Sequence, residues 1–347
     1  MHTTTRFDLD RAGLGDLLAG EPRYRVEQVW HGLYGELATP AEMTTLPKAL
    51  RARLDAEAPG ALTLVTEQVS DRGDTVKMLW GLEGGARIET VLMLYPDRAT
   101  VCVSSQAGCA MGCGFCATGQ AGFERHLGVG EIVEQVVLAA RRARDGGRRL
   151  SNVVFMGMGE PLANEARVWT AVERLHADLG LSARHLTIST VGLVPGIHAL
   201  AERPLPVNLA VSLHAANDRL RDELVPINRR YPLEELMAAC ADYLLAKGRR
   251  LSFEWALIDG VNDTPADAAE LASRCRALPL VAHVNLIPLN PTPGWPSTGS
   301  SPARVRAFRQ WLEDRGVNAT VRRNRGTDID AACGQLAAGQ PVTLRRA

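Results

Sequence analysis

Three cysteines lie close together in the segment Cys109-Ala-Met-Gly-Cys113-Gly-Phe-Cys116, with a CxxxCxxC spacing. Three thiolates in one loop can bind three irons of a 4Fe–4S cluster and leave the fourth iron open for chemistry, whereas structural sites close their shell with protein ligands. A zinc knuckle would need a fourth Cys or His nearby, and the nearest histidine, His126, follows ten residues later. The spacing therefore predicts a catalytic 4Fe–4S cluster.

The same spacing matches the signature of the radical S-adenosylmethionine (SAM) superfamily, in which the open iron binds the amino and carboxylate groups of SAM. Electron transfer then cleaves SAM to methionine and a 5′-deoxyadenosyl radical. A second segment, Gly157-Met-Gly-Glu-Pro161, is similar to the superfamily motif that binds the SAM amino group. Glycine lets a ligand approach the main chain closely. Taken alone, this segment is equally compatible with an ordinary turn between a strand and a helix.

Short apolar strands alternate with helical segments from Thr100 onward, which predicts parallel β/α units. The predicted strands cover residues 100–104, 152–156, 185–190, 207–213, 251–258 and 283–289. These units predict an α/β fold, a partial (β/α)6 radical SAM barrel. Because the loops after parallel strands build the active site, the Cys loop and the residues that end the later strands should meet at one end of the barrel.

Two smaller modules precede this core, which occupies residues 95–336. Residues 1–60 form a small helical domain, and residues 61–94 form a β extension with turns at Asp71-Arg-Gly-Asp74 and Gly84-Gly85. One helix is predicted over residues 24–34, because apolar side chains recur there at helical spacing. Those side chains are Val26, Val29, Trp30, Leu33 and Tyr34.

The composition is that of an ordinary globular protein: of 347 residues, 46% are hydrophobic and 22% are charged. No apolar run approaches the ~20 residues that span a bilayer, and the N-terminus has no apolar signal-peptide core. Seven cysteines without a secretion signal indicate reduced thiols rather than a disulfide scaffold. These features predict a cytoplasmic protein without membrane contacts. The formal net charge is zero, so only local arginine clusters could attract nucleic acid.

Several segments together resemble the RlmN family of radical SAM 23S rRNA adenine methyltransferases, from about Pro22 to Leu336. They are Glu89-Thr-Val, Arg98-Ala-Thr-Val-Cys102-Val-Ser-Ser-Gln-Ala-Gly-Cys109, Phe115-Cys116-Ala-Thr-Gly, Gly157-Met-Gly-Glu-Pro161, Val211-Ser-Leu-His214-Ala, Ile287-Pro-Leu-Asn290-Pro and Arg325-Gly-Thr-Asp-Ile-Asp-Ala-Ala-Cys333-Gly-Gln-Leu. The combination is far more specific than CxxxCxxC alone. It implies methylation of carbon 2 of a specific adenosine in 23S rRNA, and of an adenosine beside the anticodon of some tRNAs.

The resemblance also implies roles for individual residues. A first SAM methylates Cys333, giving S-methylcysteine, and a second SAM supplies the radical. Glu89 accepts a proton. Contacts to SAM fall on Gly159, Glu160, Ser189, Ser212, Leu213, His214 and Asn290. Judged individually, such serine, histidine and asparagine residues at strand ends are more often capping or packing residues than ligands.

The implied chemistry explains why two further cysteines matter. Carbon 2 of adenine is electron-poor and cannot attack the methyl group of SAM, but a carbon radical can add to it. The radical formed on the methyl group of Cys333 would attack the ring and leave a protein–RNA thioether. Loss of the ring proton and a disulfide between Cys333 and a second thiol would release the methylated base. Cys102 is the candidate, and a small apolar packing residue is the alternative interpretation.

The sequence is also compatible with two other functions. A Cfr-like enzyme, which methylates carbon 8, shares the cysteine machinery, and an RNA-binding protein with a structural metal belongs to another class. The N-terminal module resembles the helix-hairpin-helix-like RNA-recognition domain of the family. Arginines cluster within residues 141–149, 229–230, 249–250 and 322–325, where they could contact phosphates. We expect 23S rRNA and tRNA as partners, flavodoxin or ferredoxin as electron donor, and a monomer.

Overall fold

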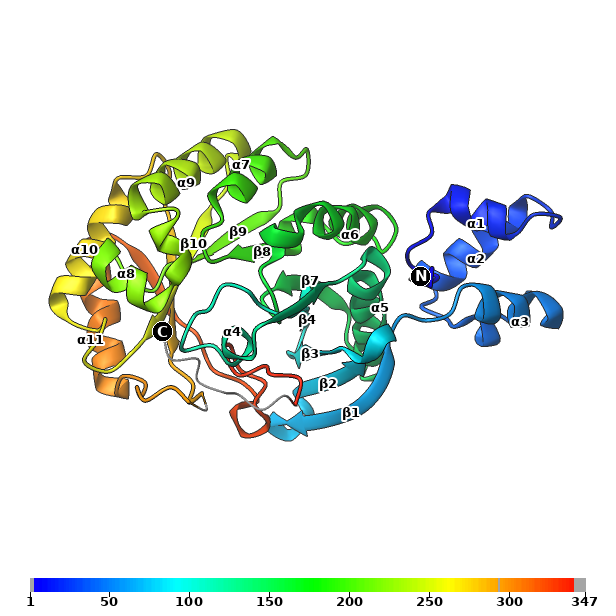
Figure 1. Ribbon diagram of the computed structural model, residues 1–347, viewed down its shortest axis with the longest axis horizontal. Coiled ribbons are helices and arrows are strands. Elements are labelled where there is room, and N and C mark those ends of the chain that lie inside the picture. Colours follow the sequence, from blue (N-terminus) through cyan, green and yellow to red (C-terminus); the bar gives the residue numbers. More distant parts are fainter. Residues whose placement is uncertain (1–2, 293, 340–347) are drawn as a thin grey trace.

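The computed structural model describes residues 3–292 and 294–339. Residues 1 and 2 of the predicted N-terminal domain, and Pro293 in the loop after the sixth predicted strand, lie outside this part of the chain. One ten-stranded sheet, in the order β1-β2-β3-β4-β7-β8-β9-β10-β11-β12, forms the centre of the molecule. Figure 1 shows the helices of the core along the outer side of the curved parallel strands.

The strands from β4 onward run parallel and form the partial barrel. They are β4 (Ala99–Cys102), β7 (Leu150–Phe155), β8 (Leu186–Thr190), β9 (Asn208–Ser212), β10 (Leu251–Leu257), β11 (His283–Pro288) and β12 (Asn318–Val321). The predicted α/β barrel and its six strands are confirmed. β12 was not predicted, because it is short and only Ala319 of its residues is buried, so it lacks an apolar pattern.

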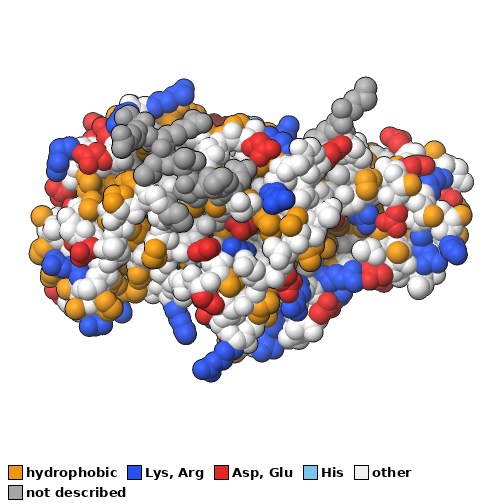
Figure 2. Space-filling view, turned by 60° about the horizontal axis from the view of Figure 1, so that its bottom comes forward, with side chains coloured by type: hydrophobic (Ala, Val, Ile, Leu, Met, Phe, Trp, Pro, Cys, Tyr) orange, Lys and Arg blue, Asp and Glu red, His pale blue; other side chains and the backbone are white. Residues whose placement is uncertain are grey.

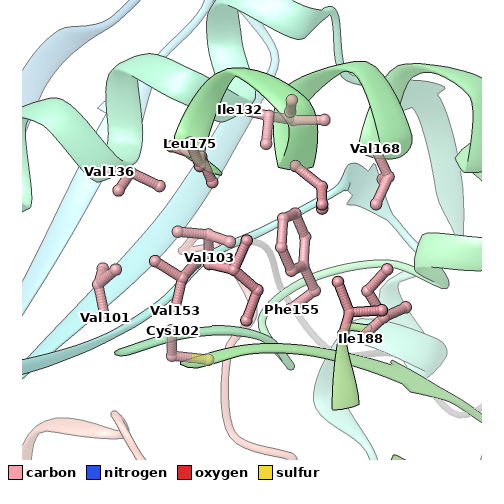
Figure 3. Packing of buried hydrophobic residues seen from close by; sticks show 14 of the residues in the cluster. Val101, Cys102, Val103, Ile132, Val136, Val153, Phe155, Val168, Leu175 and Ile188 are labelled. Carbon is pink, nitrogen blue, oxygen red and sulfur yellow. The ribbon is translucent and has the colours of Figure 1, made fainter. Parts of the chain in front are cut away.

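Helices connect these strands and bury an apolar face against them. They are α5 (Val129–Asp145), α6 (Glu165–Ala177), α7 (Val194–Glu202), α8 (Asp218–Leu224), α9 (Leu233–Lys247), α10 (Pro265–Arg276) and α11 (Pro302–Glu313). Figure 3 shows side chains of α5 and α6, such as Ile132 and Leu175, facing Val153 and Phe155 of β7. This apolar layer fixes the strands, and the strands fix the loops that follow them.

The first part of the chain adds helices on one side and strands on the sheet edge (Figure 1). The helices are α1 (Arg11–Leu17), α2 (Tyr24–Tyr34) and α3 (Lys48–Glu57). The strands β1 (Thr63–Ser70), β2 (Thr75–Gly81) and β3 (Arg87–Leu94) are antiparallel and continue the sheet up to β4. Trp30 of α2 donates its indole N–H to Asp178 over 3.1 Å, which ties the helices to the end of α6.

Beyond β12, residues 322–339 return to the interior of the barrel along β1 and β2 (red in Figure 1). The Arg325 guanidinium donates to the carbonyl of Leu94 over 2.9 Å, and Gly326 N–H donates to Asp71 over 3.1 Å. Farther on, the Thr118 hydroxyl donates to the carbonyl of Leu336 over 2.6 Å. The segment that contains Cys333 is therefore held between the β extension and the Cys loop. Among the described residues, no helix is long and apolar enough to span a membrane.

Candidate active site

One cavity at the carboxyl ends of the parallel strands contains most of the predicted site residues. It lies where the loops after the parallel strands meet, which is where ligands bind in such folds. The predicted residues that line it are Cys109, Cys113, Cys116, Gly159, Glu160, Ser189, Ser212, His214, Asn290 and Cys333. Three predicted residues, Leu213, Cys102 and Glu89, lie outside this lining.

The Cys loop is shaped by a short ribbon of β5 (Gln106–Gly108) and β6 (Phe123–His126), with α4 (Ala117–Ala121) between them. Cys109 N–H donates to the carbonyl of Gly122 over 2.8 Å. Gly108 has φ +71°, and a Cβ there would lie 1.9 Å from that carbonyl oxygen. Only glycine allows this approach, so Gly108 lets the loop turn into the cavity.

The three thiols fit a 4Fe–4S cluster by their chemistry and their placement. All three line the same cavity, and soft thiolates are the ligands that iron–sulfur clusters prefer. Burial raises the pKa of Cys109 to about 12 and that of Cys113 well above its usual value. The free thiols are therefore protonated at neutral pH, and binding of iron must displace their protons.

A structural zinc site would need several side chains that point at one metal ion. Within residues 3–292 and 294–339, no three His, Cys, Asp or Glu side chains are arranged to hold one metal ion. A 4Fe–4S cluster requires a different arrangement of the thiols, because each thiolate binds its own iron.

Two glycines bring the end of β7 close to the strand that leads into the Cys loop. Gly159 has φ +102°, and a Cβ there would lie 2.5 Å from the Cβ of Gln106. A Cβ on Gly157 would lie 2.7 Å from the carbonyl oxygen of Val103. Both positions therefore require glycine, and the Gly-Met-Gly-Glu segment lies directly against the cluster loop.

The Glu160 carboxylate is held by backbone N–H groups at the wall of the cavity. One oxygen accepts a hydrogen bond from Leu162 over 3.0 Å, and the other accepts one from Val191 over 2.9 Å. Burial raises the pKa of Glu160 to about 7 in spite of these bonds. A cation in the cavity would favour the ionised form, so this carboxylate is suited to bind an ammonium group.

His214 is a neutral hydrogen-bond donor at the end of β9. Its Nδ1 accepts a hydrogen bond from the backbone N–H of Ala256 over 3.0 Å, so the ring proton is on Nε2. Burial lowers the pKa of His214 to about 3, which keeps the ring uncharged at neutral pH. The ring packs edge-on against Phe115 of the Cys loop, with centroids 4.8 Å apart.

The remaining predicted SAM contacts differ in what they present to the cavity. Ser189 and Ser212 end neighbouring strands and line the wall. The Leu213 side chain is fully buried in the apolar core. Its backbone N–H donates to the carbonyl of Glu254 over 3.0 Å. Leu213 therefore positions the strand end, and its side chain does not reach the cavity.

Cys333 is fixed against the cavity by its own backbone. The Asn290 side-chain amide donates to the Cys333 carbonyl over 3.1 Å, and its oxygen accepts from Asn324 over 2.6 Å. Ala117 N–H, directly after the last cysteine of the Cys loop, donates to the carbonyl of Gly334 over 2.7 Å. Cys333 therefore lies beside the Cys loop, and Asn290 joins it to the end of β11.

Cys102 lies on the inner face of β4, opposite the helices. Figure 3 shows its sulfur on the far side of the strand from α5 and α6, as expected from the alternation of side chains along a strand. Burial, and to a lesser extent the neighbouring Cys333, raise the pKa of Cys102 to about 12. Cys102 does not line the cavity that contains Cys333.

Arg322 lines the cavity together with Cys333 and was not predicted as a site residue. Its pKa is raised chiefly by the negative charge of Cys333, and also by Glu254 and Cys102. The guanidinium is 3.8 Å from the Glu254 carboxylate, and both residues line the cavity. Glu254 is a charged residue within the apolar strand β10, which is a signal that could have identified it. Arg322 belongs to the arginine cluster within residues 322–325, for which the sequence indicated only phosphate contacts.

Glu89 lies on β3 and is almost completely buried. One carboxylate oxygen is 3.1 Å from the Lys77 ammonium. The other accepts hydrogen bonds from Ala337 N–H over 2.9 Å and Ala338 N–H over 3.1 Å. Glu89 therefore contacts the segment that contains Cys333, but from outside the cavity.

Two arginines of the 141–149 cluster form ion pairs with glutamates. Arg141 pairs with Glu42, and Arg142 pairs with Glu67 over 3.2 Å. Figure 2 shows basic and acidic side chains interspersed over the face that it displays. Because paired arginines are largely neutralised, these two arginines of the 141–149 cluster are weaker candidates for phosphate contacts.

Comparison with known proteins identifies the family. The Radical SAM superfamily matches residues 103–272. A protein from Chloroflexus aurantiacus named "Probable dual-specificity RNA methyltransferase RlmN" is 52% identical, over 97% of this chain and 94% of its own length. A protein of the same name from Frankia casuarinae is 56% identical, over 94% and 81%. This chain belongs to the RlmN family.

A solved structure agrees with this assignment. The crystal structure of a radical SAM methyltransferase from Sphaerobacter thermophilus matches with a TM-score of 0.93 and 54% identity, over 96% of this chain and 99% of that one. Membership of the RlmN family implies a 4Fe–4S cluster and SAM as cofactors. Cys109, Cys113 and Cys116 fit the cluster, and they line the same cavity as Gly159 and Glu160.

Proposed function

We propose that this protein methylates carbon 2 of adenosine 2503 in 23S rRNA and of adenosine 37 in tRNAs. The observation that carries the proposal is that Cys333 lines the same cavity as the three-cysteine loop and Glu160. A SAM molecule bound at Glu160 would lie within that cavity, next to the cysteine to be methylated. Residues 1–60 serve as the RNA-recognition domain, 61–94 as the β extension and 95–336 as the catalytic core. Its RNA substrates imply a cytoplasmic location.

Cys109, Cys113 and Cys116 hold the cluster, and the chain surrounds SAM with complementary groups. Glu160 accepts hydrogen bonds from the SAM amino group, and the His214 Nε2–H donates into the cavity. Ser189, Ser212 and Asn290 complete the wall, together with the backbone at Gly159, and Leu213 supports the end of β9 behind this wall. When bound, the cluster supplies the electron that cleaves SAM to methionine and a 5′-deoxyadenosyl radical, and it can take up one electron later in the cycle.

Glu160→Gln tests the SAM site directly. The variant should weaken SAM binding by about ten- to a hundredfold, because a hydrogen bond to a charged group contributes about 1.5–3 kcal/mol. The new amide group would also oppose the N–H of Leu162 or Val191, which each donate to the carboxylate. Anaerobic equilibrium dialysis with labelled SAM measures this loss. Glu165→Gln removes a carboxylate that pairs with Arg203 outside the cavity, and it should bind SAM normally.

Cys333 carries the methyl group through the reaction. Its sulfur takes a methyl group from one SAM, and the S-methyl group then loses a hydrogen atom to the radical from a second SAM. The CH2 radical adds to carbon 2 of adenine. The adduct gives up one electron, and the ring proton passes to Glu89, which restores the aromatic ring. RNA and protein are then joined through the Cys333 sulfur.

Cys102 resolves this adduct. Its thiolate attacks the Cys333 sulfur, and the sulfur–carbon bond breaks with its electron pair on the CH2 group, which takes a proton and becomes the methyl group. The charge of the buried Arg322 guanidinium lowers the pKa of Cys102 and so favours its thiolate, against the effect of burial.

Nuclease digestion and mass spectrometry of RNA treated with the reduced enzyme test the proposal. We expect 2-methyladenosine in 23S rRNA and in tRNA. Finding 8-methyladenosine instead would favour the Cfr-like alternative, which shares these cysteines. RNA binding without any methylated nucleoside, together with one bound zinc, would favour a structural metal.

A further inference from the structure

A buried ion pair joins β2 and β3 beside the Cys333 segment. Lys77 Nζ is 3.1 Å from a Glu89 carboxylate oxygen, and the two side chains are 9% and 5% exposed. Lysine is almost never buried unless it is paired, because the loss of hydration must be offset by close contacts. The proposed function gives Glu89 a role, but it does not account for Lys77.

Both members of the pair also contact the C-terminal segment. Glu89 accepts hydrogen bonds from the N–H groups of Ala337 and Ala338, over 2.9 and 3.1 Å. Lys77 donates to the carbonyl of Asp330 over 3.4 Å. These contacts fall on either side of Cys333 in the sequence, so the pair holds the Cys333 segment at two points.

The backbone around Glu89 is tied to the strand that contains the resolving cysteine. The Ser104 hydroxyl donates to the Glu89 carbonyl over 2.6 Å. In the pairing of β3 with β4, Val91 lies opposite Cys102. The backbone of Glu89 is thus fixed beside β4, and Lys77 is the one cation paired with the Glu89 carboxylate among the described residues.

We propose that Lys77 is a positioning residue whose ammonium group holds the Glu89 carboxylate oriented toward the Cys333 segment, where the carboxylate accepts the proton of the RNA adduct. This inference rests on the proposed function. In the step concerned, the bond from carbon 2 to hydrogen breaks, its electron pair stays in the ring, and the proton goes to Glu89. Without the ammonium, one oxygen of the buried carboxylate would lose its charged partner, and Glu89 would be held less firmly where it must accept the ring proton.

The test uses the reduced full-length enzyme with an RNA substrate that has hydrogen or deuterium at carbon 2 of the target adenosine. Lys77→Met keeps an unbranched side chain, shorter by one atom, and removes the charge. We expect SAM cleavage to continue and the RNA adduct to accumulate. Release of 2-methyladenosine should slow by roughly 10- to 100-fold, which is less than the full ~10²–10⁴-fold contribution of a general base because Glu89 itself remains. The isotope effect on release should exceed that of the wild type, because proton removal becomes rate-limiting.

Companion variants separate positioning from general stability. Lys77→Arg keeps the charge and should restore release in part. Lys77→Gln keeps a donor without the charge and should behave like Lys77→Met, so the result does not depend on the folding of one variant. Arg203→Met breaks the ion pair with Glu165 far from the cavity, at 2.8 Å, and should leave the isotope effect unchanged.

The outcomes distinguish this inference from the function on which it rests. Wild-type enzyme that forms 2-methyladenosine, with an unchanged isotope effect in the Lys77 variants, would overturn the role of Lys77 alone. A parallel loss of SAM cleavage, adduct and product in all Lys77 variants would also overturn it, since the pair would then only support the fold. Wild-type enzyme that forms no 2-methyladenosine would overturn both proposals.

Discussion

Cys102→Ala should convert the enzyme into a form that traps its RNA substrate. The substitution removes one sulfur from the inner face of β4 and leaves the strand pairing with β3 and β7 intact. Methylation of Cys333 and radical addition do not require this thiol, so the reaction should proceed to the protein–RNA thioether and stop there. The product yield should fall to background. A denaturing gel should show a slow-migrating, ribonuclease-sensitive band.

A matched cysteine variant controls for the loss of a buried thiol. Cys275→Ala removes a buried cysteine from α10, outside the cavity, and should release product normally without the band. Cys333→Ala combined with Cys102→Ala should abolish the band, because the bond to RNA runs through Cys333. If Cys102→Ala turns over normally, the packing interpretation of Cys102 is correct.

Cys113→Ala should abolish SAM cleavage and every later step. Cys113 is the most buried of the three cysteines in the loop, and a cluster bound by two thiolates has lost a third of its protein ligands. Anaerobic reconstitution should give little iron and sulfide and no iron–sulfur absorption band. Because the apo loop is already formed by backbone hydrogen bonds, we expect the variant to keep its fold by circular dichroism.

The same variant can also contradict the assignment of Cys113 as a cluster ligand. Formation of 5′-deoxyadenosine by Cys113→Ala at the wild-type rate, under dithionite, would mean that this cysteine is not a cluster ligand. Cys275→Ala again serves as the control and should retain a full cluster.

The sequence predicted the core because its signals are local. A buried strand such as β10 is an apolar run that ends at turn residues, and the apolar face of α5 recurs at helical spacing. β12 could not be predicted, since its pairing with β11 depends on the path of the whole barrel. In the same way, no local pattern indicated that β1, β2 and β3 would extend the barrel sheet itself.

The site was predictable where motifs follow strands and less so where groups from distant segments meet. The Cys loop and Glu160 share a cavity, as expected from the rule for parallel strands. Arg322 was read as part of a surface cluster, because only the fold brings it beside Glu254. Nothing in the local sequence distinguishes Lys77 as a site residue. Its partner Glu89 is evident only from the pairing of β2 with β3.

The fate of the SAM methyl hydrogens shows whether Cys333 carries the methyl group. With SAM that carries three deuterium atoms on its methyl group, and after several turnovers, we expect 2-methyladenosine with two deuterium atoms. The third should appear in 5′-deoxyadenosine, since the methyl group on Cys333 loses one hydrogen atom to the radical and later gains a proton from a protein group or solvent. Mass spectrometry of both products gives the count. A methylated adenosine that retains all three deuterium atoms would show direct methyl transfer and contradict the role of Cys333.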